Sequence, residues 1–295
     1  MVSSASEFVQ RKNYLLATDL DGTLLGSGKK YEDALELFRK ALILGSFTLV
    51  YVTGRNLQEI QEAVESYCLP LPRAAIAEIG TRIFYQEKGA FTEDTGWKEE
   101  LQRSAPGWDR KKIAEDLSRL EWLFEQSEEH QNPFKISYYL ASVSDLEDRL
   151  AQVKEKIEKV CPHFELVISS EPDSELVFLD VVPRRGTKAG ALEYLRKKLG
   201  FRKNRVIYAG DSGNDLHALT VGYWSVVVKN ASWELKTRVR EIARKKGISS
   251  RIYFARGQGG LDGKYVSGLV EGLVRLKAIP LHLLKSVDRF HRPHV

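Results

Sequence analysis

The sequence predicts an α/β protein in which a parallel sheet is interrupted by an inserted α+β domain. Short apolar runs alternate with amphipathic helical segments in roughly the first ninety residues and again in the last third of the chain. A strand that is buried on both faces and is followed by a helix is typical of a parallel sheet. Between these two parts, helices alternate with strands that look antiparallel, which is typical of an α+β unit.

In the first part, continuous apolar runs predict buried strands over 14–18 and 47–52. Apolar residues at helical spacing predict one helix over 34–42 and another over 57–64. The same pattern returns near the end of the chain, with strands over 177–182, 206–209 and 224–228 and helices over 187–199 and 233–243.

The middle of the chain follows a different pattern. Its apolar spacing predicts one long helix over 113–123 and a second over 146–160. A strand over 134–140 places alternate apolar residues on one face, and two more strands follow, over 165–168 and over the run 177–182 that the boundary below assigns to the core. We therefore expect an inserted domain at 89–173, and a core domain built from the two segments 1–88 and 174–295.

Composition excludes several classes of protein. The chain has 295 residues, of which 43% are hydrophobic and 29% charged, so it can bury a large core and is not disordered. No stretch approaches 18 uncharged apolar residues, and the first ten residues are polar, so we expect neither a membrane span nor a secretory signal. The two cysteines form no ligand pattern, which favours a reducing, cytoplasmic location. The net charge of +5 is too small an excess to predict nucleic-acid binding.

Two carboxylates follow the first predicted strand, in the segment Asp19-Leu20-Asp21-Gly22-Thr23. Side chains two residues apart at the end of a buried strand point roughly the same way, and Gly22 allows a tight turn. Close carboxylates repel each other, so a cation or a shared proton must offset their charge. The alternative is an ordinary turn, because Asp and Gly are common turn residues.

Three further segments lie where a parallel sheet places its functional loops, just past strand ends. Thr53-Gly54-Arg55 follows the second strand and offers a hydroxyl and a backbone amide to an anion, although an ordinary helix cap has the same composition. Lys188 opens a predicted helix and can reach an oxyanion. Gly210-Asp211-Ser212-Gly213-Asn214-Asp215 has the carboxylates and tight turn of a Mg²⁺ site.

The order of these four segments resembles the haloacid dehalogenase superfamily of Mg²⁺-dependent aspartyl phosphotransferases. The position of the insertion is similar to the type IIB cap of that superfamily. Two segments resemble its sucrose-phosphatase-like group, namely Asn132-Pro133-Phe134-Lys135-Ile136-Ser137-Tyr138 and Leu179-Asp180-Val181-Val182-Pro183. One departure is Gly80-Thr81-Arg82-Ile83, where that group usually shows G-T-E-I.

The resemblance implies a fold and a set of roles. The fold would be a Rossmann-like parallel-sheet core with an inserted cap. Asp19 would be the nucleophile and Asp21 the general acid. Mg²⁺ would be held by Asp19, the backbone carbonyl of Asp21 and Asp211, with Asp215 as a further ligand or a support. The phosphoryl oxygens would be bound by Thr53, Gly54, Lys188 and Asn214.

Recognition of the leaving group would come from the cap and the loops that face it. The candidates for sugar binding are Arg55, Arg82, Asn132, Lys135 and Tyr138. Lys135 and Tyr138 have opposite parity on one strand, so they need not share a face. The alternative is that Tyr138 packs inside the cap and that Lys135 is a solvated strand residue.

The resemblance implies a sugar-phosphate phosphatase, with sucrose 6-phosphate as the expected substrate. The alternatives within enzymes are a phosphatase for mannosylfructose phosphate or for mannosyl- or glucosyl-3-phosphoglycerate, and a phosphomutase. The alternative from another class is a sugar-phosphate-binding module that has lost catalysis. We expect a monomer that binds a small molecule and neither nucleic acid nor membrane, with association with a sugar-phosphate synthase as a further option.

Overall fold

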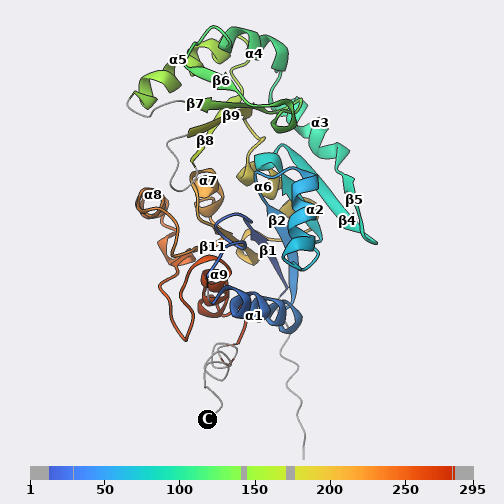
Figure 1. The fold of residues 1–295 in the computed structure, drawn as a ribbon, viewed down its shortest axis with the longest axis vertical. Coiled ribbons are helices and arrows are strands. Elements are labelled where there is room, and N and C mark those ends of the chain that lie inside the picture. Colours follow the sequence, from blue (N-terminus) through green and yellow to red (C-terminus); the bar gives the residue numbers. More distant parts are fainter. Residues whose placement is uncertain (1–12, 29, 141–144, 171–176, 281, 283–295) are drawn as a thin grey trace, which may run out of the picture.

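The computed structural model describes residues 13–280 and 282, apart from 29, 141–144 and 171–176. The predicted domain boundary at 173/174, the polar start of the chain and most of its C-terminal tail lie outside the described residues. The described chain forms two sheets, a large one at the centre of the lower part of Figure 1 and a small one above it.

The large sheet has eight strands, and six of them are parallel. The pairing is parallel from β12 through β11, β10, β1 and β2 to β3, and it becomes antiparallel at β4 and β5. The order across the sheet is β12 (Ile252–Phe254), β11 (Trp224–Val227), β10 (Val206–Gly210), β1 (Tyr14–Thr18), β2 (Phe47–Val52), β3 (Ala74–Ala77), β4 (Arg82–Glu87) and β5 (Ala90–Glu93).

Helices cover both faces of this sheet, so its central strands are apolar on both sides. Leu16 of β1 packs in one hydrophobic cluster, and its neighbours Leu15 and Ala17 pack in the other. The first cluster contains α1 (Tyr31–Leu44), α2 (Leu57–Ser66) and α9 (Tyr265–Arg275); the second contains α3 (Thr95–Ser104), α6 (Lys188–Lys198), α7 (Leu216–Leu219) and α8 (Trp233–Lys245). The predicted α/β fold class is therefore confirmed.

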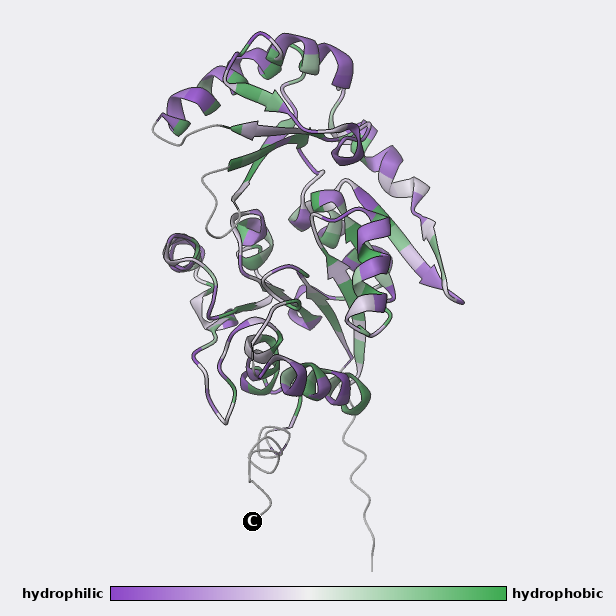
Figure 2. Cartoon of the chain, in the orientation of Figure 1, coloured by the Kyte–Doolittle hydropathy of each residue, from purple (hydrophilic) through white to green (hydrophobic). Residues whose placement is uncertain are grey.

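The small sheet is antiparallel and has the order β6 (Leu123–Glu125), β7 (Ile136–Leu140), β9 (Val177–Pro183) and β8 (Phe164–Ser170). Its outer face packs against α4 (Arg110–Leu117) and α5 (Leu146–Glu158) in a third hydrophobic cluster. Figure 1 shows these two helices on the side of the sheet that is turned away from the large sheet. Figure 2 shows hydrophilic residues along their solvent side. We call this unit, from α4 to β9, the cap.

Short 3₁₀ turns complete the described structure at Glu78–Gly80, Glu128–His130, Lys203–Arg205, Gly213–Asp215 and Ser249–Arg251. Among the described helices, none combines the length and the apolar character that crossing a membrane requires.

The sheets correct three of the predicted boundaries. The strand over 177–182 was expected in the parallel core, but β9 pairs with β7 and β8 in the cap sheet. It is mostly buried on both faces because the cap helices pack on one side and residues of the core pack on the other. The segment 90–93 was expected in the cap, yet β5 belongs to the large sheet. The predicted helix over 113–123 ends at Leu117, and Leu123 begins β6.

Candidate active site

Three neighbouring strands of the large sheet end at the same edge and bring the predicted site residues together. Asp19 follows β1, Thr53 follows β2 and Asp211 follows β10, and β1 lies between the other two strands. The carboxyl ends of parallel strands are where α/β folds bind ligands, because the chain must turn there and its loops converge. The fold thus gathers segments that are up to about 190 residues apart in the sequence.

The centre of this edge is an acidic cluster with one buried lysine. Asp19, Asp211 and Asp215 each place a carboxylate oxygen within 4.8 Å of the others. Nζ of Lys188, in the first turn of α6, donates to Oδ1 of Asp19 at 2.9 Å and to Oδ1 of Asp215 at 2.8 Å. The Lys188 side chain is 2% exposed. Such a lysine is stable only because carboxylates surround it.

The cluster carries more negative than positive charge. Burial, together with the neighbouring carboxylates, raises the pKa of Asp19, although Lys188 opposes the rise. Burial and the charge of Asp215 also raise the pKa of Asp211, to about 6. Burial by itself would lower the pKa of Lys188, but Asp19 and Asp215 outweigh it and the pKa lies above the usual value. Buried carboxylate oxygens with an excess of negative charge are the ligand set that a hard divalent cation prefers, so these residues fit Mg²⁺.

Asp215 is the structural centre of this cluster. Its Oδ1 accepts from Lys188 and from the Tyr208 hydroxyl at 2.6 Å, and its Oδ2 accepts from the backbone amides of Asp211 and Ser212 at 3.0 and 3.1 Å. Both oxygens of this fully buried carboxylate are therefore engaged within the protein. Of the two predicted options for Asp215, a metal ligand or a support, the geometry favours the support.

Tyr208→Phe tests that support. The hydroxyl is a buried donor to a carboxylate, so its removal is expected to lower the free energy of unfolding by about 1.5 to 3 kcal/mol. Urea denaturation measures the change, and Tyr67→Phe is the control because Tyr67 is 42% exposed. Equal stability of Tyr208→Phe and the parent protein would contradict the role given to this hydrogen bond.

Asp21 lies beside the cluster and is held by Arg55. The Arg55 guanidinium donates through Nε and Nη2 to the two Asp21 oxygens at 2.8 and 2.7 Å, and the Asp21 side chain is 57% exposed. Gly22 has φ +74°, and a Cβ atom there would lie 2.2 Å from Oδ2 of Asp211. The turn between Asp21 and Thr23 therefore requires glycine for its conformation and for the close approach of Asp211. Thr23 donates to Oδ1 of Asp211 at 2.7 Å.

The predicted phosphate-binding residues border the same edge. Thr53 is fully buried, and its hydroxyl oxygen accepts from the backbone amide of Arg55 at 3.2 Å. Gly54 follows it directly. The Asn214 side chain lies in the turn after β10, where its Oδ1 accepts from the Ser212 hydroxyl at 3.0 Å. The structure thus places all four predicted phosphate residues, including Lys188, on adjacent loops and helix starts.

The structure places the predicted sugar-binding residues in different surroundings. Tyr138 is 2% exposed and packs in the hydrophobic cluster between the cap sheet and its helices, so the prediction that it contacts a sugar is wrong. Its position in β7 points it to the outer face. Arg82 is paired with Glu78 and Glu93, and Asn132 donates to Glu78 and Thr81, so both are bound to the core. Arg55 is paired with Asp21, as described above.

Lys135 belongs to a buried polar group on the inner face of the cap. Asp180 of β9 lies opposite Ser137 of β7, whose hydroxyl donates to Oδ1 of Asp180 at 2.5 Å. Burial raises the pKa of Asp180, and the nearby Lys135 charge opposes that rise. Val182 and Val167, on the same face, pack against Ile79 of the core, so this face is turned toward the core. Sequence reasoning missed Asp180; a lone charge inside the apolar run of β9 was the available signal.

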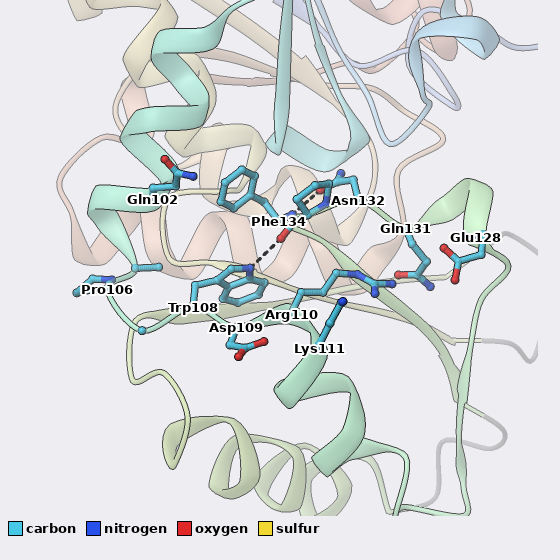
Figure 3. A pocket seen from close by; sticks show the side chains of 13 residues that line it. Gln102, Pro106, Trp108, Asp109, Arg110, Lys111, Glu128, Gln131, Asn132 and Phe134 are labelled. Atoms are coloured by element: carbon cyan, nitrogen blue, oxygen red, sulfur yellow. Dashed lines mark hydrogen bonds between the residues drawn. The ribbon is translucent and has the colours of Figure 1, made fainter.

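A hollow of about 780 Å³ lies beside the entrance to the cap (Figure 3). Nε1 of Trp108 donates to the carbonyl of Pro133 at 2.9 Å, which fixes the indole against the segment that leads into β7. The acidic cluster does not contribute to the lining of this hollow. It is formed by the loop between α3 and α4, the start of α4 and the segment 128–134.

Comparison with known proteins assigns the chain to a family. The model of the sucrose-6F-phosphate phosphohydrolase family matches residues 12–276. The chain belongs to this family. A structure of the sucrose-phosphatase from Synechocystis sp. PCC6803, in complex with sucrose and phosphate, is 27% identical with a TM-score of 0.73, and the match covers 90% of this chain and 98% of that one. The protein is thus a phosphatase of the haloacid dehalogenase superfamily.

Relatives of the family differ in length and in their described activity. A putative HAD-like hydrolase of Nitrosococcus oceani is 32% identical over 89% of this chain and 71% of its own length. Sucrose-phosphatase 2 of Nicotiana tabacum is 29% identical over 75% of this chain, which spans about half (51%) of that relative's length. Mannosylfructose-phosphate phosphatase of Agrobacterium fabrum is 25% identical over 88% of this chain and 95% of its own length.

Proposed function

We propose that this protein is a Mg²⁺-dependent phosphatase that hydrolyses a disaccharide phosphate, with sucrose 6-phosphate as the first candidate, through an aspartyl-phosphate on Asp19. The observation that carries the proposal is the cluster of Asp19 and Asp211, which follow strands β1 and β10, with the buried Lys188 at the start of α6. It lies below a cap sheet whose inner face is polar. A nucleophilic carboxylate, a fixed cation and a ligand set for a hard metal ion are the parts that phosphoryl transfer needs.

In the first step, a carboxylate oxygen of Asp19 forms a bond to phosphorus while the bond between phosphorus and the sugar oxygen breaks. Asp21 supplies a proton to the departing sugar oxygen. Because Arg55 donates to both Asp21 oxygens in this structure, the ion pair must open before the carboxyl group can carry that proton. In the second step, Asp21 takes a proton from water as the water oxygen attacks phosphorus, which releases phosphate and restores Asp19. Lys188, Thr53 and Gly54 hold phosphoryl oxygens throughout.

The metal would be held by Asp19, Asp211 and the backbone carbonyl of Asp21. When bound, Mg²⁺ supplies positive charge that reduces the repulsion between a carboxylate and a phosphoryl group. Thr23 orients Asp211 for this role, since it donates to one of the two carboxylate oxygens. Asp215 positions Lys188 and the turn that bears Asp211.

The inner face of the cap supports a sugar as the leaving group. Lys135, Ser137 and Asp180 offer donors and acceptors there. Tyr139 of β7 and Phe178 of β9 lie on the same face of the sheet as Ser137 and Asp180, because each is two residues away along its strand. The ring centroids of Tyr139 and Phe178 are 5.5 Å apart. Pockets for polar ligands combine a few directed hydrogen-bonding groups with aromatic surface. A closed cap also excludes water while the first step proceeds.

The test is phosphate release from a panel of phosphorylated sugars with Mg²⁺ and after removal of metal by EDTA. We expect turnover of disaccharide phosphates that is lost in EDTA and restored by added Mg²⁺. Full activity in the presence of excess EDTA would contradict the metal dependence. Absence of turnover on every member of the panel would contradict the proposed function.

A phosphatase for another glycoside phosphate is the second candidate, and the relative from Agrobacterium fabrum favours it because the match covers 95% of that protein. The panel therefore includes mannosylfructose phosphate and the mannosyl- and glucosyl-3-phosphoglycerates. A phosphomutase would move phosphate within the sugar and release little of it. A module without catalysis would bind sugar phosphate and release none. A monomer and association with a synthase stay predictions, which light scattering of the protein with and without a synthase would test.

A further inference from the structure

The corner between β3 and β4 belongs to the core and contacts the cap, and its backbone conformation is unusual. Glu78, Ile79 and Gly80 have φ values of +51°, +57° and +116°. Non-glycine residues in this region are strained by about 1 to 3 kcal/mol each, so contacts around them must hold the conformation. A Cβ atom at Gly80 would lie 2.2 Å from the backbone carbon of Thr187, so this corner also packs directly against the start of α6.

Hydrogen bonds join the corner to the turn that follows β2. The amide of Glu78 donates to the carbonyl of Arg55 at 2.9 Å, and the amide of Ile79 donates to the carbonyl of Thr53 at 3.0 Å. The side chain of Ile79 packs with Val167 and Val182 of the cap. The corner therefore contacts both the proposed phosphate-binding turn and the inner face of the cap.

Asn132, at the entrance to β7, is the polar link from the cap. Its Nδ2 donates to Oε2 of Glu78 and, at 2.8 Å, to Oγ1 of Thr81, and its Oδ1 accepts from the amide of Phe134 at 2.7 Å. A carboxylate can only accept and a backbone amide can only donate, so these partners determine the orientation of the Asn132 amide. Both of its hydrogens and its oxygen are thus engaged within the protein.

Arg82 is the third polar residue at this contact, beside Glu78 and Asn132. It donates to Oε1 of Glu78 at 3.2 Å and, through Nε and Nη2, to both oxygens of Glu93 at 2.8 and 2.9 Å. Glu78 is 4% exposed, so its charge requires such a partner. Arg82 therefore fixes the carboxylate that binds Asn132.

We propose that Glu78, Arg82 and Asn132 form a latch that holds the cap in register with the phosphate-binding turn. Glu78 and Asn132 are then positioning residues, and neither Asn132 nor Arg82 binds the sugar directly. The inference rests on the proposed function, because the latch matters for substrates whose leaving group contacts the cap. It assigns to Arg82 a partner within the chain, at the position where the resembling group usually has glutamate.

The test introduces a negative charge at position 132 and then moves the carboxylate of the pair from position 78 to position 132 as a rescue. Asn132→Asp places a second carboxylate against Glu78, and like charges at this distance repel. We expect kcat/KM for the best sugar phosphate to fall by about tenfold or more, as the loss of a hydrogen bond to a buried charge commonly does. The smaller substrate p-nitrophenyl phosphate should lose much less, because its leaving group has little contact with the cap.

The double variant Glu78→Gln/Asn132→Asp decides between the latch and a sugar ligand. A glutamine at 78 can donate to an aspartate at 132, so the latch predicts recovery of most of the lost kcat/KM. If Asn132 bound the sugar, the second substitution would restore nothing, and that result would overturn the proposal. Glu87→Gln is the control, since Glu87 is an exposed carboxylate at the end of β4 that pairs with Arg73 at the surface.

Hydrogen exchange without substrate separates the latch from the proposed function. Asn132→Asp should raise amide exchange both at 53–55 and at 131–134, and the double variant should lower it again. Exchange that rises at 131–134 alone would overturn the latch even if the enzyme hydrolyses sugar phosphates. Coupled exchange in a protein without sugar-phosphate turnover would retain the latch and reject the function.

Discussion

Asp19→Asn is expected to abolish phosphate release, with a fall in kcat of at least about a thousandfold, because removal of a nucleophile leaves only binding and electrostatic contributions. The amide oxygen can still accept from Lys188, so the site keeps its shape. The measurement is release of inorganic phosphate from the best sugar phosphate at saturating Mg²⁺. Asp148→Asn is the control, because Asp148 is exposed on α5 of the cap. Substantial turnover by Asp19→Asn would exclude the aspartyl-phosphate mechanism.

The same variant has a second expected effect, on stability. Burial raises the pKa of Asp19 above the value it has in the unfolded chain. A carboxyl group with a raised folded pKa contributes stability at low pH that is lost as the pH rises through the folded value. In metal-free protein, the stability of Asp19→Asn relative to the parent should therefore be greater at pH 7.5 than at pH 4, whatever constant cost the loss of the buried contact with Lys188 adds. Urea denaturation in EDTA at both pH values measures the difference, and a relative stability of the variant that falls from pH 4 to pH 7.5 would contradict the sign.

Lys188→Met is expected to damage both folding and catalysis. Methionine has a similar length and no charge, so Asp19 and Asp215 lose their cationic partner. In the parent protein, Nζ of Lys188 lies 2.9 Å from Oδ1 of Asp19 and 2.8 Å from Oδ1 of Asp215. Breaking a buried ion pair from one side costs about 3 to 5 kcal/mol, because the remaining charges stay desolvated. Phosphate release should fall by at least about a hundredfold, as for loss of a donor to a transition-state oxygen.

The pH dependence of the unfolding free energy of Lys188→Met shows whether its loss of stability comes from charge or from packing. In metal-free protein, the variant's loss of stability should shrink as the pH falls, because protonated carboxyl groups need no cation. Unfolding free energies at pH 5 and 7.5, each relative to the parent protein, measure this. Lys197→Met is the control, because Lys197 lies on the same helix and its side chain is 64% exposed. A loss of stability at Lys188→Met that is the same at both pH values would point to packing instead of charge.

The acidic cluster at the edge of the large sheet was predictable because its residues lie at fixed places in a local pattern. A buried strand followed by Asp19 or by Asp211 is recognisable from apolar runs and turn residues. Parallel pairing of β1 with β2 and β10 then requires those turns to meet. The helix that begins at Lys188 follows from its apolar spacing in the same way. Local patterns determined which elements form, and the ordering of a parallel sheet brought them together.

Which residues form the inner face of the cap sheet depended on information that is not local. The face to which a strand residue points follows from register, so Tyr138 and Ser137 exchange roles with a shift of one residue. Pairing with β9 placed Ser137 beside Asp180 on the inner face and Tyr138 among the cap helices. The same pairing shows that β9 belongs to the cap sheet and not to the core. The apolar run of β9 predicts a strand but contains no information about which sheet the strand joins.

By itself, the sequence determined the α/β class, the insertion of a cap and the residues of the acidic cluster, since each depends on spacing within one segment. Only the tertiary structure decided which charges neutralise one another. It paired Asp21 with Arg55, Arg82 with Glu78 and Glu93, and Asp215 with Lys188. The reason is physical: the free energy of a buried charge depends on partners brought by other elements of the fold, and a spacing rule within one segment carries no information about them.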